Sequence, residues 1–178
     1  MLFQNGKLLV RLLEEEDQFL LAKWLSDPEV LKYYEGRDNP FHLEKVRNVF
    51  YDPEDETMKC IIVFEGKEIG YIQFYQLDAE AKVEYGYLNE NVYGIDQFIG
   101  EVAYWNKGIG TLLVTSMVTY LLEHEKASRV VMDPQGWNKR ALKCYEKCGF
   151  KKVKFLPKHE LHEGVYQDCW LIEYIREG

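Results

Sequence analysis

The sequence predicts a mixed α/β fold in a single domain. Hydrophobic residues make up 47% of the 178 residues and charged residues 29%, a composition typical of globular proteins rather than of disordered or fibrous ones. Short apolar runs alternate with segments of helical periodicity, which indicates a layered α/β fold. No repeat, linker or low-complexity tract separates these segments, so we expect residues 1–178 to form one domain.

The first half of the chain predicts a strand, two helices and a hairpin. Helical spacing in residues 15–25 offers four apolar side chains to the core, those of Phe19, Leu20, Ala22 and Trp24. Glu65-Gly66-Lys67 has the residues of a tight turn between two strands. The expected elements are, in order, a strand at 7–13, helices at 15–25 and 43–51, and strands at 58–64 and 68–77.

The second half predicts a longer strand, the clearest helix and a closing set of strands. Residues 108–124 carry one apolar stripe at a spacing of 3.6 residues. Asn138 is a residue type that caps helix starts, and Gly149 is typical of a helix end. The expected elements are a strand at 92–102 with bulges at Gly94 and Gly100, a helix at 108–124, a buried strand at 129–132, a helix from 138 to 149, and strands at 150–156 and 168–175.

The composition also excludes several classes of function. The formal net charge of −8 argues against a nucleic acid as the main partner. Four cysteines without a CxxC pair indicate reduced thiols, hence a reducing cytoplasm. No apolar run reaches the ~18 residues of a membrane span, and the first residues lack the pattern of a cleaved leader. We therefore expect a cytoplasmic protein that does not bind membranes.

The net charge hides two blocks of opposite sign. Residues 78–101 hold six acids against one base, and residues 139–154 hold seven bases against one acid. Such blocks suit a site that binds an anion on one side and a cation on the other. They also suit two solvated faces of amphipathic elements. The acids are Asp78, Glu80, Glu84, Glu90, Asp96 and Glu101.

The strongest local motif is Trp105-Asn106-Lys107-Gly108-Ile109-Gly110-Thr111, between a predicted strand and the clearest helix. Two glycines remove side chains where a ligand must approach the backbone, and the helix start exposes unpaired N–H groups. This combination predicts an anion cradle suited to a pyrophosphate. A tight turn that needs glycine explains the same residues. The motif is not a P-loop, because the downstream Gly-Lys-Ser/Thr is missing, and it is not GxGxxG, because Leu113 occupies the last position.

A second motif follows in the predicted helix after Asn138. Tyr145 lies seven residues, or two helical turns, beyond Asn138, so both fall on one helix face. A phenol and an amide that face a cleft can donate a proton and anchor a ligand. Taken by itself, the pattern favours a capped amphipathic helix with a tyrosine in the core.

Together the two motifs resemble the GCN5-related N-acetyltransferase (GNAT) superfamily. The Gly-x-Gly turn resembles its acetyl-CoA-binding motif, and the Asn–Tyr–Gly-Phe helix resembles the segment that follows. Over nearly the whole chain the sequence resembles the aminoglycoside 6'-N-acetyltransferases, including the acetyltransferase half of the bifunctional aminoglycoside-modifying enzyme. The motifs that carry this resemblance are residues 93–101, Tyr104-Trp105-x-Lys107 to Thr111, Asp133-Pro134, Asn138-x-Arg140-Ala141 and residues 156–164.

The resemblance implies a GNAT fold, a mostly antiparallel mixed sheet whose central strands splay apart and are flanked by helices. It implies that the pantetheine arm of acetyl-CoA lies between the strands at 92–102 and 129–132. Backbone N–H groups near Phe98 and Ile99 would then polarise the thioester carbonyl, and one such donor is worth roughly 3 kcal/mol. The other residues expected to bind acetyl-CoA are Lys107, Gly108, Ile109, Gly110, Thr111 and Asn138.

Trp105 departs from the superfamily pattern. That pattern is Gln/Arg-x-x-Gly-x-Gly/Ala, and Trp105 stands where Gln or Arg is usual. Because the usual residue helps to bind the pyrophosphate, we expect Lys107 and the backbone amides to contribute more here.

The resemblance also implies a function, transfer of acetyl from acetyl-CoA to the 6'-amino group of an aminoglycoside antibiotic by direct attack in a ternary complex. We expect Asp96 to meet the amine, mainly to orient it and hold its charge, since an ordinary aspartate with a pKa of ~3.9 is a weak base. Tyr145 is the expected acid for the departing CoA thiolate. Tyr93, Asp133 and Asp168 are expected to contact the small cationic substrate along with Asp96.

Two further points stay open. The alternatives are another amine acceptor (a polyamine, an N-hydroxylysine siderophore precursor or a protein N-terminus) and a non-catalytic acyl-CoA-binding sensor. The protein is either a monomer or a homodimer.

His159 and His162 do not follow the His-Glu-x-x-His spacing and lack a third ligand, so we expect no metal and a loop that packs over the acceptor site.

Overall fold

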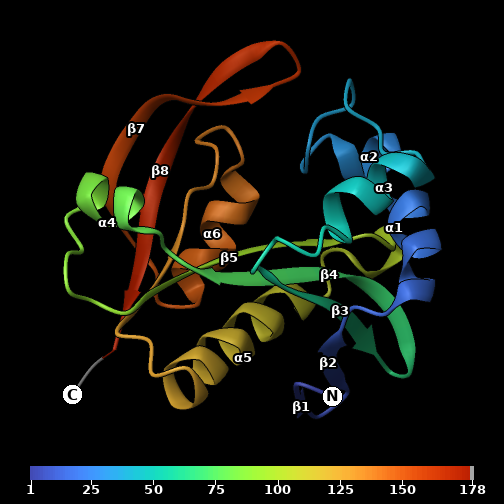
Figure 1. The fold of residues 1–178 in the computed structure, drawn as a ribbon, viewed down its shortest axis with the longest axis horizontal. Coiled ribbons are helices and arrows are strands. Elements are labelled where there is room, and N and C mark those ends of the chain that lie inside the picture. Colours follow the sequence, from blue (N-terminus) through green and yellow to red (C-terminus); the bar gives the residue numbers. More distant parts are fainter. Residues whose placement is uncertain (177–178) are drawn as a thin grey trace. The chain divides into compact units, whose positions relative to one another are not determined.

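We analysed a computed structural model of the chain, which describes residues 1–176. Within this range the strands form one eight-stranded sheet in the order β1-β2-β3-β4-β5-β6-β8-β7 (Figure 1). The pairs β1–β2, β2–β3 and β6–β8 are antiparallel, whereas β5–β6 is parallel. The sheet is therefore mixed and mostly antiparallel, as predicted.

The strands are β1 (Phe3–Asn5), β2 (Leu8–Leu12), β3 (Met58–Phe64), β4 (Lys67–Gln76), β5 (Val92–Ile99), β6 (Arg129–Met132), β7 (Lys151–His162) and β8 (Val165–Ile175). The α-helices are α1 (Gln18–Trp24), α2 (Pro28–Leu31), α3 (Leu43–Phe50), α4 (Ala79–Tyr85), α5 (Ile109–His124) and α6 (Lys139–Lys147). Two 3-10 turns, η1 (Glu15–Asp17) and η2 (Val102–Tyr104), complete the described elements. No helix within residues 1–176 is long and apolar enough to cross a membrane.

The chain folds into two compact units, and β4 and β5 each contribute residues to both. The first unit comprises Met1–Gln73, Gln97–Ile109 and His162–Val165. The second comprises Phe74–Asp96, Gly110–Leu161 and the chain from Tyr166 onward. We describe each unit separately.

Aromatic side chains form much of the core of the first unit. The ring of Phe98, near the end of β5, lies 4.6 Å from that of Tyr34 and 5.7 Å from that of Tyr71, measured between centroids. It also meets Trp24 of α1 edge-on at 6.1 Å. A Cβ atom at Gly100 would lie 2.2 Å from Trp24 Cγ. Gly100 is thus the glycine that lets the indole pack against the end of β5, and no bulge is needed to explain it.

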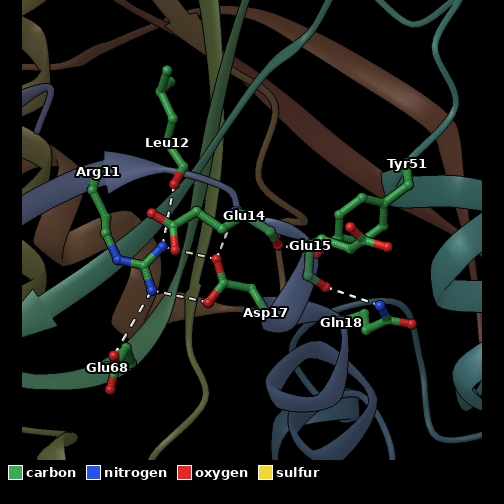
Figure 2. A network of polar contacts seen from close by, with 8 residues as sticks. All are labelled: Arg11, Leu12, Glu14, Glu15, Asp17, Gln18, Tyr51 and Glu68. Carbon is green, nitrogen blue, oxygen red and sulfur yellow. Dashed lines mark hydrogen bonds and ion pairs between the residues drawn. The ribbon is translucent and has the colours of Figure 1, made fainter.

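A network of hydrogen bonds connects β2 to the start of α1 in the same unit (Figure 2). The Arg11 guanidinium donates two hydrogen bonds to the Asp17 carboxylate, at 2.8 and 2.9 Å. The Glu14 backbone N–H donates a third at 2.7 Å. Asp17 is only 4% exposed, and although burial alone raises the pKa of its carboxyl, the Arg11 and Glu14 hydrogen bonds lower that pKa below its ordinary value.

One predicted core residue lies outside the core. Phe19 is 60% exposed, whereas Leu21, Trp24 and Leu25 are at most 1% exposed. Phe19 precedes Leu21 by two residues, about 200° around the helix, so it faces solvent when the Leu21 stripe faces the core. The prediction was wrong because the buried stripe of α1 contains Gln18, Leu21 and Trp24, and Phe19 lies off that stripe.

Turn chemistry explains how the two long hairpins of the sheet close. Glu65 and Gly66 have φ values of 49° and 80°, and Glu163 and Gly164 have 50° and 81°. Positive φ at both central residues is the pattern of a two-residue type I′ hairpin turn. The first turn was predicted. The second was not, and it corrects the expected loop at 159–164, because β7 continues through His162 to the turn before β8 begins (Figure 1).

The remaining differences concern β5 and short elements. β5 ends at Ile99 rather than at residue 102, and η2 follows at once. The sequence interpretation missed β1, α2 and α4, each of seven residues or fewer. The predicted helix at 108–124 is confirmed as α5, and Leu113, Met117 and Leu121 of its stripe are at most 1% exposed.

Candidate functional site

The parallel pairing of β5 with β6, in the second unit, covers three residues. Its register joins Val92 to Arg129, Tyr93 to Val130 and Gly94 to Val131. Asp96 lies two residues beyond the last paired position of β5, and Asp133 lies two residues beyond that of β6. Because side chains alternate along a strand, these offsets keep each aspartate on the face of the last paired residue. Two carboxylates thus mark the point where the pairing ends.

Tyr75 of β4 lies across this point. An added Cβ atom at Gly94 would lie 2.5 Å from the Tyr75 Cζ atom, so the tyrosine ring occupies the space that a side chain at position 94 would need. The Tyr75 hydroxyl oxygen lies 2.7 Å from that Cβ position, and Asp96 is the next side chain on the same face of β5. Burial raises the pKa of Tyr75, and the charges of Asp96 and Asp133 raise it further. Tyr75 is therefore a protonated donor at neutral pH.

Polar groups of β7 and β8 contact one another and the segment that follows β6. The His159 Nε2 atom lies 2.9 Å from Asp133 Oδ2, and the Glu160 carboxylate accepts a hydrogen bond of 2.9 Å from the Gln135 amide. Asp168 of β8 accepts the Lys158 backbone N–H at 2.9 Å. Burial raises the pKa of the Cys169 thiol to about 12, and the charges of Glu160, Asp133 and Asp168 contribute. We call Asp96, Asp133, Glu160 and Asp168 the acidic cluster.

The structure brings three of the four predicted substrate residues into this cluster, and Tyr93 lies elsewhere. Tyr93 follows Val92 and precedes Gly94, so it points to the face of β5 opposite that of Gly94 and Asp96. Its side chain is 7% exposed, and its hydroxyl donates to Glu125 at 3.2 Å. Its role in substrate binding stays a prediction.

Sequence reasoning missed Tyr75 and Glu160 as members of the site. A glycine in the middle of a strand is a signal that another group approaches closely, and Gly94 gave that signal for Tyr75. Glu160 lay in a segment expected to be a loop, and its partner Gln135 is 25 residues away in the chain. Nothing in the linear spacing indicated that contact.

The two glycines of the Gly-x-Gly motif have different explanations. Gly108, in the first unit, has a φ of +78°, a conformation that favours glycine, and the space around its Cβ position is open. A side chain there strains the turn rather than filling an occupied space. Gly110, in the second unit, has no such φ, and an added Cβ would meet only Cys144 Sγ at 3.7 Å. The tight-turn alternative accounts for Gly108 but leaves Gly110 unexplained.

A thiol pair lies beside Gly110 and Thr111 at the start of α5. The Thr111 Oγ1 atom lies 3.5 Å from Cys144 Sγ, and the Cys148 Sγ atom lies 3.7 Å from the Thr111 carbonyl oxygen. Hydrogen bonding between the two thiols lowers the pKa of Cys144, and Thr111 and Lys147 add to this effect against the burial of the thiol. The first turn of α5 therefore has an acidified thiol as its neighbour.

Trp105, in the first unit, has a structural explanation. Its indole N–H donates to the Ile99 carbonyl at 2.8 Å, and its ring meets that of Tyr33 edge-on at 5.7 Å. The residue that replaces the usual Gln or Arg thus holds the end of β5, next to Phe98. Lys107, two residues on, is exposed.

The second motif forms α6. The Asn138 side chain accepts the Ala141 backbone N–H at 3.3 Å and so caps the helix, as predicted. Tyr145 is half-buried, with its ring 6.4 Å from that of Phe150. The cap occupies the Asn138 side-chain oxygen, so the alternative of a capped amphipathic helix explains this side chain. The proposed ligand roles of Asn138 and Tyr145 stay predictions.

The acidic block of the sequence does not form one surface. Asp78 caps α4. A Glu90 carboxylate oxygen lies 2.8 Å from Arg129 Nε. The carboxylate oxygens of Glu101 lie 3.0 Å from Lys23 Nζ and 3.6 Å from Lys67 Nζ. Asp96 alone of the block enters the acidic cluster. The residues 1–176 contain no group of three or more His, Cys, Asp and Glu side chains that could hold a metal ion.

Comparison with known proteins identifies the family. A family model described as an acetyltransferase (GNAT) domain matches residues 14–157. The chain belongs to the GNAT acetyltransferase family. The predicted resemblance is confirmed, and the splayed arrangement expected of GNAT folds agrees with the three-residue pairing of β5 and β6.

Several relatives of this GNAT acetyltransferase act on, or are solved with, aminoglycosides. The aminoglycoside N(6')-acetyltransferase type 1 of Klebsiella pneumoniae is 28% identical over 155 residues, which cover 83% of this chain and 76% of that protein. The solved structure of aminoglycoside acetyltransferase AAC(6')-Ib with coenzyme A and kanamycin has a TM-score of 0.75 at 26% identity over 95% of each chain. A spermidine N-acetyltransferase from Vibrio cholerae, solved with coenzyme A and spermine, has a TM-score of 0.77 over 96% of each chain, but its 16% identity indicates a common fold alone.

Proposed function

We propose that this GNAT acetyltransferase, with residues 1–178 acting as one domain, transfers acetyl from acetyl-CoA to a primary amine of a small polycationic acceptor, the 6'-amino group of an aminoglycoside. One observation carries the proposal. Carboxylates from β5, the end of β6, β7 and β8 gather where the β5–β6 pairing ends. Several negative charges of separate origin suit an acceptor with several ammonium groups.

In this proposal the acidic cluster binds and orients the acceptor. Asp96 holds the reacting ammonium group, and Asp133 and Asp168 attract the other charges of the substrate. The ammonium group must lose a proton before it can attack, and an ordinary aspartate is too weak a base to remove much of it. We therefore assign Asp96 an orienting role and let water carry the proton away.

The residues proposed for acetyl-CoA follow from the family motif. The missing explanation for Gly110 within the protein supports a ligand that approaches the backbone there, and the start of α5 suits its phosphates. The proposed residues are Phe98, Ile99, Lys107, Gly108, Ile109, Gly110, Thr111 and Asn138. Solved structures of AAC(6')-Ib contain coenzyme A or acetyl-CoA, which supports this assignment.

Acetyl-CoA supplies an activated acetyl group whose carbonyl carbon accepts the amine. As the carbon–sulfur bond breaks, the departing thiolate gains a proton, for which Tyr145 is the proposed donor. The backbone N–H groups of Phe98 and Ile99 are the proposed donors to the thioester oxygen, a position where one hydrogen bond contributes roughly 3 kcal/mol.

A thiol-release assay with a panel of amines tests the proposal. Neomycin and paromomycin form a matched pair, because they differ in having an amine or a hydroxyl group at the 6' carbon. We expect kanamycin and neomycin to release CoA thiol and paromomycin to release much less. Turnover of spermidine without turnover of kanamycin would show the aminoglycoside assignment to be wrong. Binding of acetyl-CoA in calorimetry with no turnover of any amine would favour the non-catalytic sensor.

A further inference from the structure

We propose that Tyr75 is a positioning residue for acetyl transfer, which fixes the Asp96 carboxylate for the amine and acts only through Asp96. This inference rests on the role given to Asp96 in the proposed function. It adds a residue that lies outside every motif of the sequence and that reaches the site from the neighbouring strand β4.

The first support is the space that Gly94 leaves for the ring. Atoms Cζ, Cε2 and Oη of Tyr75 lie 2.5, 2.6 and 2.7 Å from the position of a Cβ atom at Gly94. Any other residue at position 94 would displace the phenol. Gly94 lies inside β5 without a positive φ, so the backbone itself does not require glycine. Glycine in a strand interior is destabilising relative to alanine, and here it makes room for one side chain.

The second support is the direction in which the hydroxyl group points. From Gly94, the next side chain on the same face of β5 is Asp96, and a hydrogen bond with its side chain is among the interactions that raise the pKa of Tyr75. A hydrogen bond from a phenol to a carboxylate is among the stronger ones in proteins, because the acceptor is charged. It holds one carboxylate oxygen in a fixed direction, and a carboxylate has acceptor positions to spare for an amine.

The third support is that the surroundings of the phenol favour its protonated, hydrogen-bond-donating form. The groups that act on the phenol are Asp96 of β5, Asp133 after β6 and Tyr85 of α4. Burial and these neighbours all keep the phenol protonated, so it stays a donor throughout the pH range of an assay. Its influence on the reaction therefore passes through Asp96.

The Tyr75→Phe variant keeps the ring over Gly94 and removes only the hydroxyl group. We expect kcat with the preferred amine to fall about tenfold, in keeping with the loss of a hydrogen bond to a charged group. The Kd of acetyl-CoA should stay within twofold. Without its donor the Asp96 carboxylate is easier to protonate, so the acidic limb of the pH profile of kcat/KM should move to higher pH.

A matched control comes from the same unit. The Tyr87 hydroxyl donates to the buried Glu173 carboxylate at 2.6 Å, outside the acidic cluster. Tyr87→Phe removes the same kind of hydrogen bond and should affect stability in urea, with no shift of the acidic limb. Gly94→Ala gives a second route to the same test, because its methyl group displaces the phenol. It should reproduce the shift that Tyr75→Phe causes.

The outcomes separate this inference from the proposed function. In an Asp96→Asn background, Tyr75→Phe should lower kcat by less than twofold, since its effect passes through Asp96. An impaired Asp96→Asn beside a fully active Tyr75→Phe would overturn the inference alone. So would a loss of kcat in Tyr75→Phe that leaves the acidic limb in place and persists in the Asp96→Asn background. A fully active Asp96→Asn would overturn both the inference and the proposed role of Asp96.

Discussion

Two groups of carboxylates in this protein differ in the partners that the protein gives them. In the first unit, Asp17 receives two hydrogen bonds from Arg11 and one from a backbone N–H (Figure 2). Glu101 of the same unit accepts from the Trp24 indole at 2.5 Å and from Lys23 at 3.0 Å. In the second unit, the His159 ring nitrogen lies 2.9 Å from Asp133 Oδ2, and Asp168 accepts a backbone N–H.

The difference separates carboxylates that hold the fold together from carboxylates that can act on a ligand. A charge that is neutralised by the protein's own arginine or lysine has little field left for a substrate. The charges of Asp96 and Asp133 raise the pKa of the Tyr75 phenol. Those of Glu160, Asp133 and Asp168 raise the pKa of the Cys169 thiol. The negative potential of the acidic cluster suits a cationic acceptor.

The largest effect is expected among the cysteines. Their thiols differ in pKa, and therefore in reactivity, according to their surroundings. The pKa of Cys144, beside the proposed acetyl-CoA site, is lowered to about 6, and burial raises those of Cys60 and Cys169 to about 12. Only the thiolate reacts with iodoacetamide, and a thiolate of lower pKa is a weaker nucleophile, so at pH 7.5 Cys144 should react about 50-fold faster than Cys60 or Cys169. Peptide mass spectrometry over a time course measures this. Equal rates at Cys144 and Cys60 would contradict the assignment.

The next effect concerns stability. Asp17→Asn should lower the free energy of unfolding by about 3 kcal/mol in urea, because Arg11 loses a buried ionic partner. The pKa of Asp17 is lowered in the folded protein, so its contribution is full above the unfolded value of about 3.9 and is lost as the pH falls through the folded value. Asp133→Asn is the contrasting variant and should change stability by less than about 1 kcal/mol. An Asp133→Asn variant as unstable as Asp17→Asn would erase the distinction.

Gly110→Ala should weaken acetyl-CoA binding about tenfold and leave the fold intact. The added methyl group meets Cys144 Sγ at an ordinary contact distance, and alanine favours a helix over glycine. Calorimetry with acetyl-CoA measures the affinity, and urea unfolding serves as the control. Unchanged affinity would mean that no ligand approaches the backbone at this residue.

The smallest effect is expected for Asp133→Asn in catalysis. Removing one of several charges from a solvated site changes the binding energy of a cation by about 1 kcal/mol, so KM for the amine should rise about fivefold. Added salt should reduce the difference between the variant and the natural protein, since it screens the charge. kcat at saturating amine should change by less than twofold. A KM that is the same in the variant and in the natural protein would remove Asp133 from the acceptor site.

Some elements of the fold could be predicted to the residue and others could not. The predicted strands at 58–64 and 129–132 coincide with β3 and β6, since both are runs of apolar or β-branched residues with clear ends. α4 was missed because it buries none of its residues and so shows no apolar stripe. Its one signal was Asp78, whose side chain accepts the Ala81 N–H as a helix cap.

The candidate site shows the same limit. Asp96 and Asp133 stood in motifs that could be recognised from the sequence. Tyr75 and Glu160 join them through the order of strands in the sheet, which places β4 beside β5 and β7 beside β8. That order is decided by long-range pairing, and residue spacing within a motif carries no information about it.

The most direct test of the account is the effect of Asp96→Asn on two quantities in one preparation. One is the turnover of the preferred amine in the thiol-release assay, and the other is the Kd of acetyl-CoA in calorimetry. We predict that turnover falls more than tenfold and that the Kd stays within twofold, because the carboxylate serves the acceptor alone. An equal loss of turnover and of acetyl-CoA affinity would contradict the account, since Asp96 would then support the fold rather than hold the amine.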